Sequence, residues 1–470
     1  MNKAINWISS LLPGVKSPLM RLSFKQKLIW TSLILLAFFV LGVLPLYGLG
    51  LNALEQFEQL SIILGAKFGS IISLGIGPIV TASIVLQLLV GSKILNIDQH
   101  TKEGKAYYQQ LQKVVSIGFI ILESLVFVLM GGLAPDPALA GTSSYIVMQW
   151  LLVLQLFIGG MLILYMDEVI QKWGFGSGIS LFIAAGVSQE IFVRAFSPLN
   201  SLGQIAFGSG QAPIGALLVF VMSLIEGVPT QALIAIVSIL ATILIFTLSV
   251  YAQAMKVEIP LSFGRVRGFG MRWPLNFLYT SNIPVILIAA LLANIQLFGR
   301  LFENWGIPWL GTFSGNVAAT GIVKWVATPN IVMRAIQSGI TGIDVLQAFV
   351  YVVILLIGAV VFSIFWMQTA GMDAKSQAKN IMSSGLYISG FRKDERIIER
   401  ILKRYIMPLT VMGGIAIGLL AAGADILGAL SRGTGILLAV MIIYKLYEDI
   451  GRHHMMDMHP ALRKMMGGSD

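Results

Sequence analysis

Ten segments of this 470-residue chain are apolar enough and long enough to cross a lipid bilayer. A hydrocarbon core about 30 Å thick requires about 20 apolar residues at about 1.5 Å per residue. Such a segment must be helical, because lipid offers its backbone no hydrogen-bond partner. We therefore predict an all-α polytopic membrane protein with spans at Leu28–Leu46, Ile71–Gly91, Val114–Leu133, Tyr145–Met166, Ile179–Phe196, Ala232–Ala254, Leu275–Leu297, Val345–Met367, Tyr405–Gly423 and Gly428–Tyr447.

The composition agrees with a chain whose solvent is the bilayer. Hydrophobic residues make up 56% of it and charged residues 11%, against about 25% charge in a soluble domain. Residues 1–27 are rich in basic residues and hold two prolines, which is unlike a cleavable signal peptide, so we expect a retained cytosolic segment with a surface helix at Ala4–Leu12. The chain has no cysteine, which excludes disulfides and thiolate metal sites.

Positive charge decides between ten and eleven spans. An eleventh apolar run, Ala212–Ile225, is too short to span comfortably, and crossing there would move every later loop to the other side. With ten spans, only six of the 32 basic residues fall on the outer side, and the rule that basic loops stay in the cytosol then places both termini there. The six are Lys67, Arg194, Arg300, Lys324, Arg334 and Arg432.

The spans divide evenly around the longest external connection, residues 197–230. Five spans precede it, in residues 28–196, and five follow it, in residues 231–450. If the halves are related, an odd number of spans in each makes them inverted repeats that meet at the membrane midplane, as in some transporters. A plain ten-helix bundle remains the alternative from the pattern alone.

The segment 47–70, between the first two spans, contains glycines and charges and cannot cross lipid. Apolar residues recur in it every three to four positions, which predicts a short amphipathic helix. It either lies on the outer surface or folds back into a cavity. The residues of that apolar face are Leu51, Leu54, Phe57, Leu60 and Leu64.

Glycines also weaken two of the spans. Gly75, Gly77 and Pro78 interrupt the start of the second span, and glycines precede Ile179 in the fifth. Backbone that is not helical at this depth must be buried in protein or line water. Close helix packing without a pore is the other explanation of these small residues.

The sequence gives no sign of an enzyme or of a bound cofactor. Gly104-Lys105 is followed by alanine, so a phosphate-binding loop is absent, and the histidines and methionines of the tail, residues 451–470, are predicted to be solvated. Glu123 is the one ionisable residue that lies well inside a predicted span. An ion-coupled secondary solute transporter, the alternative function, normally has several such groups.

Two predicted cytosolic loops, residues 256–273 and 370–404, carry clustered arginines with glycines between or before them. Positive charges of this kind can serve topology or contact anionic lipid. Arginines can also donate bidentate hydrogen bonds to RNA phosphates. Both interpretations remain open from the residues alone.

Six motifs, in this order, resemble the SecY/Sec61-alpha family of protein-conducting channels, and most closely its archaeal branch. The resemblance covers essentially the whole chain and implies two inverted five-helix halves around an hourglass pore. The function that it implies is a passive gated channel for unfolded secretory proteins, which also releases transmembrane segments sideways into lipid. The motifs are Leu74–Thr81, Gly176–Ile179, Val257–Leu261, Ser281–Ile286, Gly390–Arg392 and Gly433–Gly435.

The resemblance also implies roles for particular residues. The segment 47–70 would be a plug, a polar cluster of Thr81, Glu123 and Asn294 would lie at a lateral gate, and Arg265, Arg267 and Arg392 would dock the ribosome. A ring of aliphatic side chains would form the pore constriction and resist ion leakage by dewetting. These side chains are Ile76, Val80, Ile179, Ile183, Ile286 and Leu438.

The implied partners are a SecE/gamma-type single-span subunit, a small beta subunit, the ribosome with its rRNA, signal sequences, nascent chains and membrane lipid. The implied location is the cell membrane.

Overall fold

A computed structural model describes residues 14–20, 22–52, 67–91, 94–95, 97, 101–139, 141–200, 204–206, 212–263, 270–280, 283–314, 317–337, 339–383, 386–388 and 394–458. Each predicted span corresponds to a helix in this part of the chain. The first half contains α2 (Phe24–Val43), α4 (Gly77–Gly91), α5 (Lys102–Leu129), α6 (Ser143–Trp173) and α7 (Gly178–Phe196). The second half contains α9 (Pro229–Ala254), α10 (Ile283–Asn304), α13 (Gly342–Thr369), α15 (Glu395–Leu427) and α16 (Gly433–Met458).

The fold is that of an all-helical polytopic membrane protein. Among the described residues, eight helices are long and apolar enough to cross a membrane, and α4 is a shorter apolar helix. The apolar run in the external connection forms α8 (Ala216–Ile225), whose 10 residues are too few to span a bilayer. Shorter helices are α11 (Gly321–Val326), α12 (Ile331–Gln337) and α14 (Ala374–Ser383), with a 3₁₀ turn at Pro137–Leu139.

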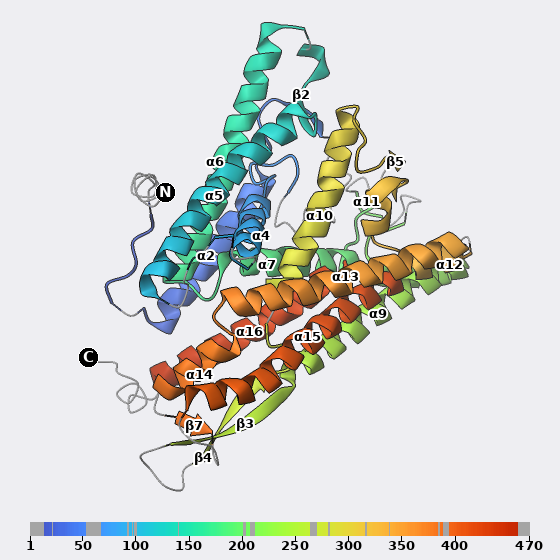
Figure 1. Ribbon diagram of the computed structural model, residues 1–470. Helices are drawn as coiled ribbons and strands as arrows, with labels where there is room; N and C mark the ends of the chain where they lie inside the picture. The colour runs from blue at the N-terminus through green and yellow to red at the C-terminus, as the bar shows by residue number, and fades with distance from the viewer. Residues whose placement is uncertain are drawn as a thin grey trace.

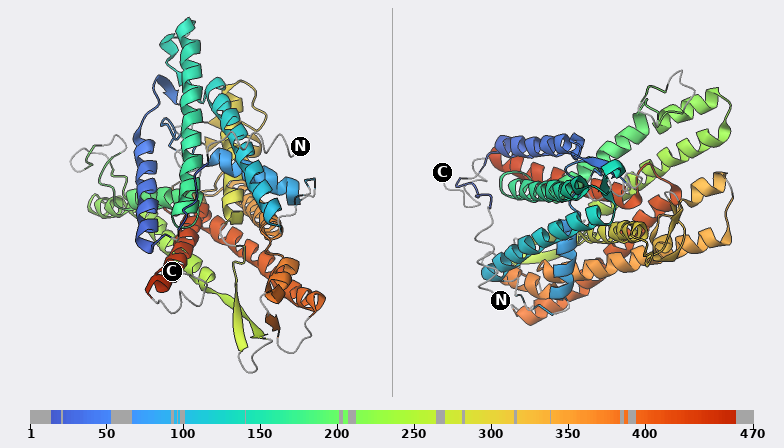
Figure 2. Two further views of the ribbon diagram at one scale, coloured as in Figure 1. Left: turned by 90° about the vertical axis from the view of Figure 1, so that its left-hand side faces the viewer. Right: turned by 90° about the horizontal axis from the view of Figure 1, so that it is seen from above.

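The helices pack around α10, which is buried along most of its length. Helices α5 and α6 rise together on one side, whereas α9, α13 and α15 run side by side on another (Figure 1). Helix α4 contacts α10 and α13, and α7 contacts α16, so the two halves of the chain meet along two seams. Seen from above, α2 lies beside α16 (Figure 2).

A small antiparallel sheet extends from one end of the bundle (Figure 1). It consists of β4 (Gly270–Asn276), β3 (Lys256–Phe263) and β7 (Leu386–Ile388), in that order. Ile259 and Leu275 of this sheet pack with α14 and the start of α15 in a second apolar core. Two smaller pairings join β1 (Leu49–Asn52) to β2 (Leu133–Pro135) and β5 (Phe313–Ser314) to β6 (Val317–Ala318).

The second span begins as predicted from its glycines. Residues 71–76 form successive turns before α4, in which Gly75 takes the left-handed φ of +56°. The backbone bonds are of the i to i+3 type, such as Ser73 N to Ser70 O at 3.0 Å. Ile72, Leu74 and Ile76 are at most 2% exposed. The irregular backbone is therefore buried in protein, where its polar groups find partners.

Three boundary predictions are wrong. The seventh span does not begin at Leu275, because residues 270–276 pair with β3, and α10 starts only at Ile283. Gly428 does not start the tenth span but ends α15, with a left-handed φ of +70°. The tail is helical as far as Met458, because α16 continues past the predicted limit Tyr447. The predicted surface helix Ala4–Leu12 lies outside the described residues.

We expect Gly159→Ala in α6 to destabilise the protein by about 1–3 kcal/mol. A Cβ atom at Gly159 would lie 2.9 Å from the carbonyl carbon of Ile71 and 3.2 Å from its Cγ2, so the turns before α4 would have to move. Gly118→Ala in α5 is the matched control, because a Cβ atom there meets nothing within 4 Å and alanine favours a helix. Melting in detergent should show a lower temperature for Gly159→Ala and an equal or higher one for Gly118→Ala. Equal melting temperatures for Gly159→Ala and the unaltered protein would contradict this packing.

Candidate pore, gate and docking sites

The six predicted ring residues come from four helices and both halves of the chain. Ile76 directly precedes α4 and Val80 lies in it, Ile179 and Ile183 lie in α7, Ile286 in α10 and Leu438 in α16. Five of them belong to one apolar core cluster, and Ile179 packs against it. The structure thus brings the six into one apolar region. That region also contains many ordinary packing residues, so their role as a constriction stays a prediction.

The three predicted gate residues form a hydrogen-bonded chain across three helices. Asn294 Nδ2 on α10 donates to Thr81 Oγ1 on α4 at 2.9 Å. Thr81 Oγ1 lies 3.4 Å from Glu123 Oε1 on α5 and 2.8 Å from the carbonyl oxygen of Gly77. Glu123 is 3% exposed. Because α10 belongs to the second half of the chain, the Asn294–Thr81 bond crosses the seam between the halves.

Glu123 is not the one carboxylate buried in the helices, and the prediction that it stands alone there is wrong. Asp167, Glu190 and Asp425 are also buried, at 8%, 8% and 4% exposure. Asp167 and Asp425 lie near helix ends, whereas Glu190 lies within the fifth predicted span. Each accepts hydrogen bonds from neighbouring groups.

The predicted plug helix is wrong at its beginning. Leu51 lies in β1, which pairs with Leu133–Pro135 rather than starting a helix. Residues 49–52 form a strand and not a helix because pairing with β2 gives hydrogen-bond partners to their backbone groups. Gly48, with a φ of +81°, turns the chain just before this strand. The other predicted plug residues, Leu54, Phe57, Leu60 and Leu64, lie outside the described residues.

The predicted ribosome-docking arginines also fall outside the described residues. Arg265 and Arg267 lie in the sequence between β3 and β4, and Arg392 follows β7 by four residues. Since β3 pairs with both β4 and β7, the two basic loops begin at one three-stranded sheet. Arg272, on β4, forms an exposed ion pair with Glu258 at 2.9 Å.

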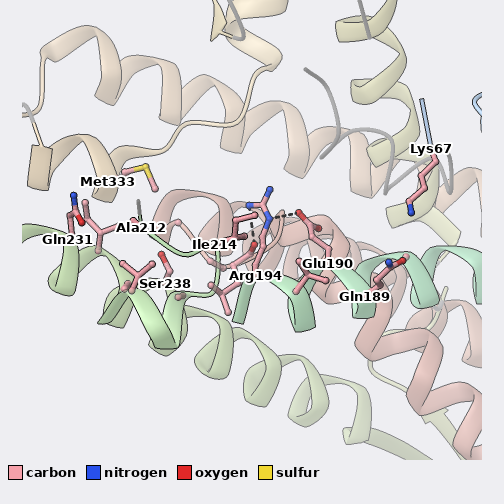
Figure 3. A pocket seen from close by; sticks show the side chains of 18 of the residues that line it. Lys67, Gln189, Glu190, Arg194, Ala212, Ile214, Gln231, Ser238 and Met333 are labelled. Carbon is pink, nitrogen blue, oxygen red and sulfur yellow. Dashed lines mark hydrogen bonds and ion pairs between the residues drawn. The ribbon is translucent and has the colours of Figure 1, made fainter. Parts of the chain in front are cut away.

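A cavity of about 760 Å³ lies beside α7, between α2, α8, α9, α12 and the connection from α15 to α16 (Figure 3). Glu190 and Arg194 line it and form an ion pair at 3.1 Å from Arg194 Nε to Glu190 Oε1. Glu190 also accepts a hydrogen bond from Ser431, and Arg194 donates to the carbonyl oxygen of Leu430 at 3.3 Å. Sequence reasoning missed this pair, although its four-residue spacing at a span end was a usable signal. Over the described residues, no group of three or more histidines and carboxylates is placed to hold a metal.

Comparison with known proteins decides the family. The family model SecY matches residues 70–447. The protein translocase subunit SecY of Methanothermobacter thermautotrophicus is 45% identical, and the match covers 97% of each chain. The chain belongs to the SecY family. The corresponding subunit of Methanocaldococcus jannaschii is 43% identical over 97% of each chain.

Solved structures agree with membership of the SecY family. A protein-conducting channel superposes with a TM-score of 0.81 at 42% identity, covering 97% of this chain and 99% of that one. Sec61 in the canine ribosome–channel complex from the endoplasmic reticulum gives a TM-score of 0.78 at the same identity and coverage. The chain is a SecY-type protein-conducting channel subunit of the Sec translocase and not an enzyme. The alternative of a solute transporter is thereby set aside.

We expect Asn294→Leu to let α4 separate from α10 more readily. The change removes the donor to Thr81 and thus about 1 kcal/mol of attraction across the seam, so the separated state should become about fivefold more populated. Single-molecule energy transfer between dyes on α5 and α13 measures this separation. Because the chain has no cysteine, Ile121→Cys and Phe349→Cys give unique labelling positions, and both side chains are exposed.

Gln112→Leu is the control for that measurement. Gln112 Nε2 donates to Ser83 Oγ at 2.7 Å, and this bond joins α5 to α4 on the same side of the seam. The control should leave the dye separation unchanged. An unchanged separation in Asn294→Leu, or an equal change in both variants, would contradict the account.

Proposed function

We propose that the chain is a passive, gated conduit for unfolded polypeptide whose seal is the aliphatic ring Ile76, Val80, Ile179, Ile183, Ile286 and Leu438. The observation that carries this proposal is the assembly of these residues, from both halves, in one apolar region. An empty apolar constriction expels water and therefore blocks ions, whereas a polypeptide of any sequence can displace the side chains because none makes a specific polar contact.

The proposed lateral exit lies where α4 and α5 of the first half face α10 and α13 of the second. Contacts of α4 with α10 and α13 support a seam at this place, and the hydrogen-bonded chain Asn294–Thr81–Glu123 adds a polar contact across it. A hydrophobic signal segment that binds between these helices would favour the open state by its differential affinity for it. Residues 47–70 are the proposed plug, in which Leu51 belongs to β1 and Leu54, Phe57, Leu60 and Leu64 to the proposed helix.

We further propose that the sheet β4–β3–β7 presents Arg265, Arg267 and Arg392 to the ribosome. Its two basic loops support this, as does the resemblance to a channel solved in a ribosome–channel complex. The charge distribution supports a cytosolic position for both termini in the cell membrane. A SecE/gamma-type subunit, a small beta subunit, nascent chains and lipid complete the proposed set of partners.

Polar substitutions in the ring should make the closed channel leak ions. Replacing Ile76 and Ile183 with asparagine places groups that retain water at the constriction, so we expect the conductance of the idle channel to rise at least about tenfold. Planar-bilayer recordings of the complete translocase measure it. Leucine at the same two positions keeps the ring apolar and should leave the conductance low. Equal conductance in the asparagine and leucine variants would remove the ring from the proposal.

Alanine at Arg265, Arg267 and Arg392 should weaken ribosome binding and lessen its dependence on salt. Each arginine that contacts an RNA phosphate contributes about one unit to the slope of log affinity against log salt concentration. Binding titrations at several salt concentrations measure both quantities. Arg272→Ala is the control, because this arginine lies on the same sheet but is paired with Glu258. If the triple variant binds as the control does, the three arginines serve topology alone.

A further inference from the structure

The start of α7 is held by two side chains from two other helices. Asp167, in the last two turns of α6, accepts a hydrogen bond at Oδ1 from the backbone N–H of Ile179 at 3.0 Å. Thr31 Oγ1, on α2, accepts one from the backbone N–H of Phe175 at 3.1 Å. These bonds fix the chain just before and just after the first helical residue, Gly178.

The start of α16 is held in the same way. Asp425, in the last turn of α15, accepts at Oδ1 from the backbone N–H of Gly433 at 2.6 Å. Thr242 Oγ1, on α9, accepts from the backbone N–H of Leu430 at 2.9 Å. In each half of the chain the threonine comes from the first of the five spans, the aspartate from the fourth, and the held helix is the fifth.

The correspondence extends to single positions at the threonines and the ring residues, whereas the aspartate bonds differ by one residue, at Ile179 after the helix start and at Gly433 on it. Phe175 and Leu430 each stand three residues before the first residue of the held helix, and Ile183 and Leu438 each stand five residues after it. Both threonine hydroxyls donate to a carbonyl oxygen one turn back in their own helices, at 2.9 and 2.7 Å. The two ring residues therefore lie at the same distance, about 7.5 Å, along their helices from corresponding attachments.

The stability of their own helices does not explain where the two aspartates lie. Asp425 lies in the last turn of α15, which carries the negative end of the helix dipole, where a carboxylate is unfavourable. Both side chains are also buried, and burial of a carboxylate is costly unless hydrogen bonds compensate. At Oδ1 of each aspartate the compensating donor belongs to the next helix in the chain. At Oδ2, Asp167 accepts from Gln171 of its own helix at 2.7 Å, and Asp425 accepts from the hydroxyl of Tyr351 on α13 at 2.6 Å. Asp167 and Asp425 are thus suited to fastening the next helix.

Glycine permits the close approach that the bonds require. A Cβ atom on Gly178 would lie 2.7 Å from Cα of Asp167, and one on Gly433 would lie 2.6 Å from Cβ of Ala424. Real Cβ atoms do not pack so tightly. Any residue other than glycine at these two positions would therefore require the neighbouring helix to shift. Helices α7 and α16 then contact each other at the seam between the halves.

We propose that Thr31 with Asp167, and Thr242 with Asp425, are two equivalent clamps that set the heights of α7 and α16, so that Ile183 and Leu438 meet in one ring. The four are positioning residues, because they act through the helices and do not touch the translocated chain. This inference rests on the ring proposed above. In both halves the fifth helix is held by a threonine and an aspartate, and this repetition is not visible from the sequence alone.

Valine at Thr31 and Thr242 tests the clamps with little change of shape. The double variant loses both hydroxyl acceptors, and we expect the idle conductance per channel of the complete translocase to rise about tenfold. Serine at the same positions keeps the acceptors and should restore low conductance. For the aspartates, alanine should cause leakage, whereas asparagine retains an acceptor oxygen for the backbone N–H and should cause much less.

Two controls separate positioning from general stability. Thr247→Val removes an exposed hydroxyl on α9 that bonds the carbonyl oxygen of Ile243 in its own helix. Asp394→Ala removes the side chain that caps α15, a helix without a ring residue. Both should leave the conductance per channel low even where the melting temperature falls. A merely structural role for the clamps would make their variants behave like these controls.

The same recordings should include Ile183→Asn as a direct disruption of the ring. If the Ile183→Asn channel leaks and the valine and alanine variants of the clamp residues do not, the clamp proposal is wrong and the ring proposal is retained. If serine at Thr31 and Thr242 leaks as much as valine, the hydroxyl bonds are not the cause and the clamps are again wrong. If neither Ile183→Asn nor the clamp variants leak, the ring fails and the clamps fail with it.

Discussion

The need to satisfy every backbone hydrogen bond away from water governs this molecule. Lipid supplies no partners, so the ten long apolar segments form helices, whose bonds are internal. Backbone that is not helical occurs within the bundle where protein supplies the partners. The turns at 71–76 are covered by α6, where Gly159 and Gly160 permit the approach, and the joints before α7 and α16 use threonine and aspartate side chains.

The same constraint explains how a channel can be both tight and able to open. Helices whose own bonds are complete can move as rigid bodies, and only the few contacts between them need to change. At the seam of α4 with α10, a polar bond between Thr81 and Asn294 is added to apolar packing. At the opposite seam, α7 packs on α16, and each is fastened to its own half. The α4–α10 seam can therefore separate while α7 and α16, which carry Ile183 and Leu438, keep their positions at the other seam.

The pattern of apolar residues predicted all ten helices, the failure of the run Ala212–Ile225 to span, and the weak start of the second span, because these follow from local length and composition. The start of the seventh span could not be found in this way, since Leu275 is equally apolar in a strand that pairs with residues before it in the chain. The prediction that Leu51 lies in a helix was wrong for the same reason, because the strand that pairs with it begins at Leu133. The clamps were invisible because Thr31 and Phe175 are 144 residues apart, and Thr242 and Leu430 are 188 apart. The gate triad was predicted by family resemblance rather than by pattern.

Photo-crosslinking from position 183 to a ribosome-tethered nascent chain tests the central claim most directly. A photoreactive residue at Ile183 should capture the translocating chain, and capture should stop when the nascent chain is released. The same residue at Leu240, an exposed position on α9, should capture none. Capture from Leu240 equal to that from Ile183, or none from Ile183 while translocation proceeds, would contradict a path through the aliphatic ring.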